Sequence, residues 1–121
     1  MLTEYRKLVF PESDLIEAIT AHDSMSLKLF ASRDVVKIEV TESPDIRISA
    51  KLRGKDGQDE PIQLENSYVV AAMVRYCVEN KIPLPRRGEK LLELDEGRLA
   101  LSICMDGSSV PVEDDSYYVL L

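Results

Sequence analysis

The chain has 121 residues, of which 45% are hydrophobic and 31% charged, with a formal net charge of −7, one histidine and two cysteines. That length fits one compact domain, and the apolar fraction is too high for a disordered chain. No apolar run approaches the ~20 residues that cross a bilayer, and the first residues lack the apolar segment of a signal peptide. We therefore expect a cytoplasmic domain with no membrane partner.

The negative charge is concentrated at the C-terminus. Residues 106–121 contain four carboxylates and no base, so they carry −4, whereas residues 1–105 carry only −3. We expect a single domain over residues 1–105 and an acidic tail over residues 106–121. An acidic chain repels nucleic acid and anionic membranes, so we do not expect a nucleic-acid partner.

The N-terminal part begins with a mixed segment and a helix. Glu4–Phe10 alternates loosely between apolar and charged residues and predicts either a short edge strand or an extended arm. Pro11 and the acidic residues after it are typical of a helix start, so we expect a helix over residues 12–22. The pattern of Met25–Ala31 is compatible with a continued helix or a short strand.

Period-two alternation marks the next segments as strands. Apolar and polar residues alternate over residues 36–41 and again over residues 46–53, with a turn-forming cluster between them. This pattern predicts an antiparallel hairpin with one buried face. Residues 61–64 predict a third short strand, with Pro61 at its beginning, where a missing N–H donor is tolerated.

A second helix is predicted over residues 67–80. Its apolar residues recur at spacings of three and four, and Asn66 or Ser67 can cap it. Arg75 and Glu79 are the only charged residues in the segment. A helix that is apolar nearly all round must be covered on more than one side.

Two kinds of cover are possible for this helix. A second copy of the chain would cover it through Val70, Val74 and Val78, or Met25–Ala31 and the C-terminal tail would fold over it. Because a domain of this size has few other helices, we expect the homodimer.

The C-terminal part predicts a connector and a second hairpin. Ile82–Pro85 is extended, because a residue before proline avoids helical geometry. Residues 90–95 and 98–104 alternate as strands, and Gly97 in the turn between them can adopt positive φ. These elements together predict an α+β fold, in which an antiparallel sheet of about five strands carries two helices packed on one face.

Candidate catalytic residues are few. His22 follows the predicted first helix, and we expect it to be solvated or to stabilise the helix end rather than to act as a base. Cys77 and Cys104 lie in apolar stretches, and we expect two buried free thiols. One histidine and two distant cysteines cannot supply a zinc site, and nucleotide-binding and hydrolase motifs are missing from the sequence. We therefore expect no metal and no cofactor, and we lean against an enzyme.

A cluster of five cations after the second helix is the best local candidate for a binding site. It consists of Arg75, Lys81, Arg86, Arg87 and Lys90, opposed by Glu79 and Glu89, so residues 75–90 carry a local charge of +3. Arginines on a proline-stiffened loop can present forked donors to a carboxylate, a phosphate or an acidic partner. The alternative is a solvated helix end, in which Lys81 complements the helix dipole.

The stretch Ala71–Leu94 resembles part of a family of small uncharacterised bacterial proteins, of proteobacterial type. The resemblance rests on Arg75-Tyr76-Cys77, then Lys81-Ile82-Pro83-Leu84-Pro85-Arg86-Arg87, then Glu89-Lys90 and a strand. It covers about a third of the chain and implies no activity.

The sequence thus predicts a non-enzymatic protein-interaction or regulatory module that forms a homodimer. The surplus apolar surface of the helix over residues 67–80 is the main support for this prediction. The alternative is a domain that binds a small anion or phosphate ligand, or an enzyme with a dispersed site, around Arg86, Arg87 and Lys90.

Overall fold

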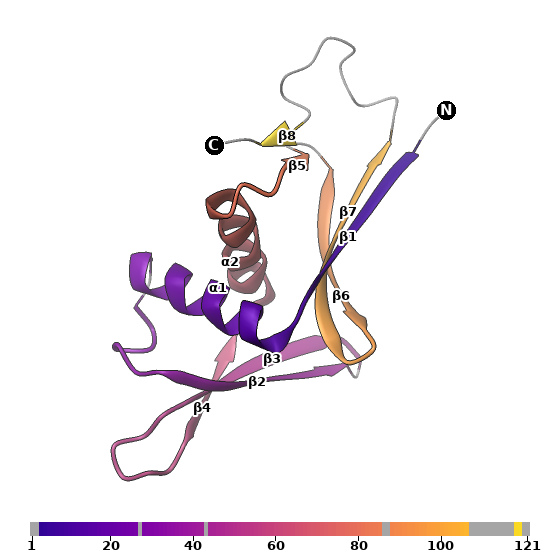
Figure 1. Cartoon of the computed structure of the whole chain (residues 1–121). Coiled ribbons are helices and arrows are strands. Elements are labelled where there is room, and N and C mark those ends of the chain that lie inside the picture. The colour runs from indigo at the N-terminus through magenta and orange to yellow at the C-terminus, as the bar shows by residue number, and fades with distance from the viewer. Residues whose placement is uncertain (1–2, 27, 43, 86–87, 107–117, 120–121) are drawn as a thin grey trace.

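A computed structural model describes residues 3–26, 28–42, 44–85, 88–106 and 118–119 (Figure 1). The two helices are α1 (Glu12–Met25) and α2 (Asn66–Glu79). The strands are β1 (Thr3–Phe10), β2 (Val35–Glu42), β3 (Ile46–Leu52), β4 (Glu60–Leu64), β5 (Leu84–Pro85), β6 (Glu89–Asp95), β7 (Arg98–Asp106) and β8 (Tyr118–Val119). Each predicted helix and strand is confirmed in its place, and Glu4–Phe10 belongs to a strand.

Six strands of the described residues form two three-stranded antiparallel sheets, in the orders β1–β7–β6 and β2–β3–β4. The α+β class is confirmed, whereas a single sheet of about five strands is not. The hairpin of β6 and β7 joins β1 instead of the first hairpin, because β1 pairs with β7 from Thr3 opposite Asp106 to Phe10 opposite Leu99. In addition, β5 and β8 pair with each other, so the described part of the predicted tail forms a short strand.

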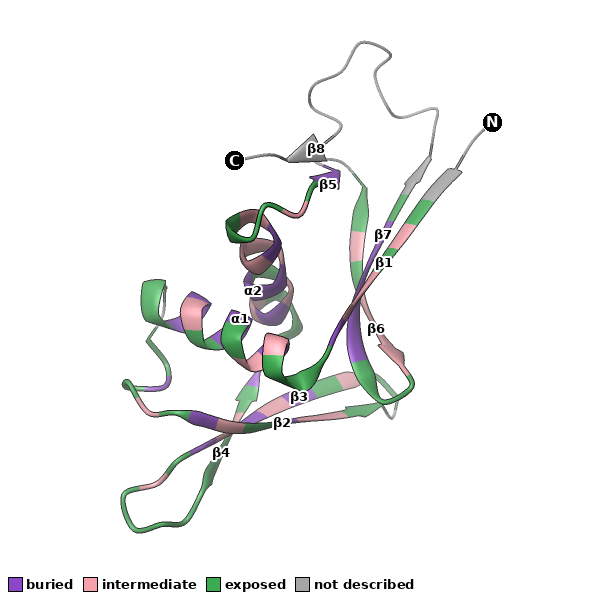
Figure 2. Ribbon diagram, in the orientation of Figure 1, coloured by how far each residue is buried: buried purple, intermediate pink, exposed green. Residues whose placement is uncertain are grey.

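Both sheets and both helices contribute to one core. Figure 1 shows α1 and α2 in the angle between the two sheets, and buried residues gather where these elements face one another (Figure 2). Fully buried side chains come from every part of this arrangement, including Ile19, Ile48, Met73 and Leu101. Among the described residues, no helix is long and apolar enough to span a bilayer.

The apolar surface of α2 is covered to a large extent by the chain itself. Val69, Ala72, Met73 and Cys77 are buried on α2, which contacts α1, β3, β5 and β6. Val70 and Val74 are partly buried and pack against the core. These intramolecular contacts cover much of the apolar surface that suggested a dimer through α2. A dimer interface on α2 therefore stays a prediction.

Two local predictions need correction. The residue that caps α2 is Glu65, and no side chain makes the capping hydrogen bond. Asn66 instead donates from Nδ2 to the carbonyl oxygen of Ile46 at 3.1 Å, which ties the start of the helix to β3. Cys77 is buried as expected, but Cys104 is exposed, because its position on β7 points away from the core.

Candidate functional site on the outer face of the β1–β7–β6 sheet

The β1–β7–β6 sheet has one face toward the helices and one face away from them (Figure 1). Leu99, Leu101 and Ile103 of the central strand point to the core and are buried. Because side chains alternate along a strand, the residues between them, and their cross-strand neighbours, form the other side. We call it the outer face, and it consists of Tyr5, Lys7, Val9, Glu89, Leu91, Glu93, Asp95, Arg98, Ala100, Ser102 and Cys104.

The outer face carries two large exposed hydrophobic side chains. Tyr5 on β1 is 54% exposed and Leu91 on β6 is 50% exposed, so one lies on each edge strand of the sheet. The exposed thiol of Cys104 lies on the strand between them. No described helix or strand covers this face (Figure 1).

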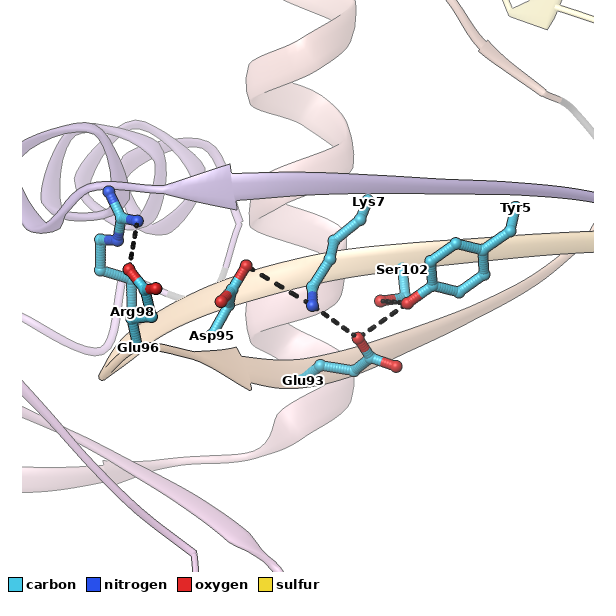
Figure 3. A network of polar contacts seen from close by, with 7 residues as sticks. All are labelled: Tyr5, Lys7, Glu93, Asp95, Glu96, Arg98 and Ser102. Atoms are coloured by element: carbon cyan, nitrogen blue, oxygen red, sulfur yellow. Dashed lines mark hydrogen bonds and ion pairs between the residues drawn. The ribbon is translucent and has the colours of Figure 1, made fainter.

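A polar network crosses the same face between β1 and β6 (Figure 3). The Tyr5 hydroxyl donates to Glu93 Oε2 at 2.9 Å and lies 3.2 Å from Ser102 Oγ. Either hydroxyl can be the donor in the second contact, because each has one proton and can also accept. The Lys7 ammonium lies 3.5 Å from carboxylate oxygens of both Glu93 and Asp95.

The network holds its charged groups in their ionised forms. Hydrogen bonds from Ser102 and Tyr5, with the nearby Lys7 ammonium, lower the pKa of the Glu93 carboxyl. Partial desolvation disfavours the charge on Lys7, but Asp95 and Glu93 outweigh it and raise the pKa of Lys7. A general base or acid works best with a pKa near the operating pH. Both shifts move the pKa values of Glu93 and Lys7 away from neutrality, so these two groups are poorly matched to proton transfer at pH 7.

The structure separates the cations of the predicted binding cluster. Arg75 donates from Nε to His22 Nδ1 at 3.1 Å and is directed at α1. Lys81 follows the C-terminal end of α2, whereas Lys90 on β6 lines a hollow together with Asn66, Ser67 and Val70 of α2, and Lys81 is not among its lining residues. Arg86 and Arg87 lie outside the described residues.

His22 is neither solvated nor a simple helix cap. Its ring is 8% exposed, stacks edge-on against Tyr68 at 4.9 Å, and accepts the hydrogen bond from Arg75. Burial, with the charge of Arg75, lowers the pKa of His22 although Asp23 acts in the opposite direction. The imidazole is therefore neutral at pH 7, with its proton on Nε2.

Tyr5, Leu91 and Glu93 are the residues that sequence reasoning missed. The signal for Leu91 was present, because the alternation that turns Leu92 and Leu94 toward the core, where they are partly buried, puts Leu91 on the polar side of the strand. Tyr5 could not be placed, because the sequence of Glu4–Phe10 is compatible with either a strand or an extended arm. In addition, Cys104, the residue opposite Tyr5, lies almost a whole chain length away in sequence.

Comparison with known proteins adds no relative to this description. Scans against protein-family models, curated proteins and solved structures find no match. The resemblance of Ala71–Leu94 to small bacterial proteins stays a prediction.

Proposed function

We propose that this protein is a non-enzymatic interaction module that forms a homodimer through the outer face of the β1–β7–β6 sheet. The observation that carries the proposal is the pair of half-exposed side chains, Tyr5 and Leu91, on a sheet face that no described element covers. Aromatic side chains are enriched at protein interfaces, and tyrosines in their centres contribute strongly to binding.

The charges on this face favour a second copy of the chain as the partner. The dimers formed most often have twofold symmetry, in which one patch contacts the same patch on its partner and must complement itself. The outer face carries Lys7 and Arg98 beside Glu93 and Asp95, so both signs of charge are available for pairing. A partner with a strongly positive surface would repel Lys7 and Arg98, and one with a strongly negative surface would repel Glu93 and Asp95.

The test is the mass in solution at increasing concentration. Wild type at tens of micromolar is expected at twice the 13.6 kDa of one chain. Leu91→Asp places a carboxylate beside Glu93 on the β6 side of the face, so the dissociation constant should rise at least ~10-fold. A wild type that stays monomeric throughout would refute the proposal.

Val78→Asp is the matched control, because Val78 belongs to the alternative interface on α2 and is partly exposed. The proposal expects Val78→Asp to dimerise as wild type does. If Val78→Asp becomes monomeric while Leu91→Asp remains dimeric, the interface lies on α2 and the outer face is excluded.

A further inference from the structure

A cavity of about 310 Å³ lies beside β1. Four consecutive residues of this strand, Lys7 to Phe10, line it. Successive side chains point to opposite faces of a sheet, so a cavity that touches all four must follow the edge of the strand. The other edge of β1 is occupied by β7 over these same residues. The cavity therefore lies along the free edge.

The opposite wall of the cavity comes from the helices. Tyr76 and Cys77 of α2, Ile82 after it and Asp14 of α1 line this side. The Tyr76 hydroxyl donates to Asp14 Oδ1 at 2.8 Å, and its ring meets Phe10 edge-on with centroids 5.5 Å apart. These contacts join both helices to the end of β1, so the wall is held in place without a ligand.

The free edge of β1 supplies backbone hydrogen-bonding groups next to this apolar cavity. In an antiparallel pair, alternate residues direct their N–H and C=O groups away from the partner strand. Among the described residues, β7 is the one sheet neighbour of β1. An exposed edge with an adjacent pocket is the arrangement that binds an extended peptide, since the backbone gives affinity and the pocket selects a side chain.

The charge at the cavity indicates the chemistry of the added segment. Asp14 lines the cavity, and Glu17 also lies beside the Tyr76 hydroxyl. Lys7 lines it too, but its ammonium is paired with Glu93 and Asp95 on the outer face of the sheet. Asp14 and Glu17 would attract a lysine or arginine and repel an acidic segment.

We propose that β1 binds an extended segment of another protein by strand addition, with an apolar side chain in the cavity and a basic residue facing Asp14 and Glu17. This surface is the edge of the sheet, whereas the proposed homodimer uses its outer face, so each proposal can fail without the other.

A displayed library of random peptides tests the site, with selection on wild type alone and the affinity of the selected peptides then measured for wild type and for Ile82→Trp, which fills the cavity. We expect enriched peptides with an apolar residue near a basic one, and at least ~10-fold weaker binding to Ile82→Trp. Failure to enrich any peptide, or a pool that binds both proteins equally, would overturn the proposal.

Two further measurements do not depend on the folding of Ile82→Trp. A selected peptide with methyl groups on alternate backbone nitrogens should bind at least ~10-fold more weakly, because strand addition needs those N–H donors. Equal affinity of the methylated peptide would overturn strand addition. Asp14→Asn keeps an acceptor for Tyr76 and should weaken a basic peptide by up to about fivefold, while Glu79→Gln on the exposed end of α2 should not.

Hydrogen exchange of the β1 amides distinguishes a second copy from a foreign segment. The proposal expects exchange on the free edge to slow when the selected peptide is added and to be independent of protein concentration without it. Protection that rises with protein concentration alone would show that β1 pairs with β1 of another copy, and would overturn the proposal.

Discussion

Among the carboxylates that accept a hydrogen bond from a tyrosine hydroxyl, Asp23 and Glu93 lie in opposite surroundings. Asp23, 4% exposed between the helices, accepts from Tyr68 at 2.7 Å and from the backbone N–H groups of Leu29 and Phe30. Glu93 accepts from Tyr5 at 2.9 Å on the open outer face. The hydrogen bonds to Asp23 replace those that its carboxylate loses to water on burial, and they fix the turn at Leu29 and Phe30. The Tyr5–Glu93 hydrogen bond is exposed, so water competes for both partners. The same chemistry is therefore structural in one place and available for recognition in the other.

Removal of the buried carboxylate is expected to have the largest effect on stability. Asp23→Ala leaves two backbone N–H groups and a tyrosine hydroxyl without their acceptor, and should lower the free energy of unfolding by about 2–3 kcal/mol. Urea denaturation measures this loss. Asp45→Ala, at an exposed position in the β2–β3 turn, is the control and should change it by less than about 0.5 kcal/mol. Similar losses in the two variants would contradict the structural role of Asp23.

Removal of one hydroxyl group from Tyr68 or from Tyr5 should lower the free energy of unfolding by different amounts in the two regions. Tyr68→Phe should cost about 1–2 kcal/mol, because it removes a partly buried hydrogen bond to a carboxylate. Tyr5→Phe should cost less than about 0.5 kcal/mol in the monomer, since water can replace the hydroxyl at Glu93. The measurement is denaturation at a concentration below the dimer dissociation constant. Equal costs would remove the distinction between the two sites.

Acid should affect the buried region first. The folded chain holds the pKa of His22 below its ordinary value of 6.5, so the unfolded chain takes up the proton first. The stabilisation is complete above about pH 6.5 and is lost as the pH falls toward the folded pKa. Wild type should therefore be less stable at pH 5.5 than at pH 7.5, and His22→Gln should lose this difference. If the loss of stability between pH 7.5 and pH 5.5 persists in His22→Gln, another titratable group causes it.

The smaller acid effect belongs to the outer face. Because Ser102 and Tyr5 lower the pKa of Glu93, its contribution is present above the ordinary carboxyl pKa of 4.5 and disappears as the pH falls through the lowered value. Glu93→Gln should remove this component while leaving the His22 step intact, which separates the two regions by their pH windows.

The local parts of this fold could be read from the sequence, and the distant pairings could not. Alternation of Val36, Ile38 and Val40 with polar residues located β2, and the turn at Gly97 fixed the β6–β7 hairpin, where Glu96 and Gly97 both have positive φ. Such signals lie within a few residues of each other. The choice of β1 as the neighbour of β7 joins opposite ends of the chain, and local periodicity carries no information about it.

The proposed interface could not be read from the sequence for the same reason. Arg75, Lys81 and Lys90 form a cluster of positive charge along the sequence, but in the fold Arg75 bonds His22 and Lys90 lines a hollow that neither of the other two lines. Tyr5 and Glu93 are far apart in sequence and meet only after β1 and β6 take their places on either side of β7. His22 likewise has its partner on the other helix, and a single histidine beside an aspartate gave no sign of it.

The central claim, that two copies meet through the outer face, can be tested most directly at Cys104. Cys104 is an exposed thiol on this face, and the other cysteine, Cys77, is buried. Its rate of reaction with a thiol reagent should fall as the protein concentration rises through the dimer dissociation constant, and should stay constant in Leu91→Asp. A rate for wild type that does not change while the mass doubles would show that the dimer uses another surface, and would contradict the account.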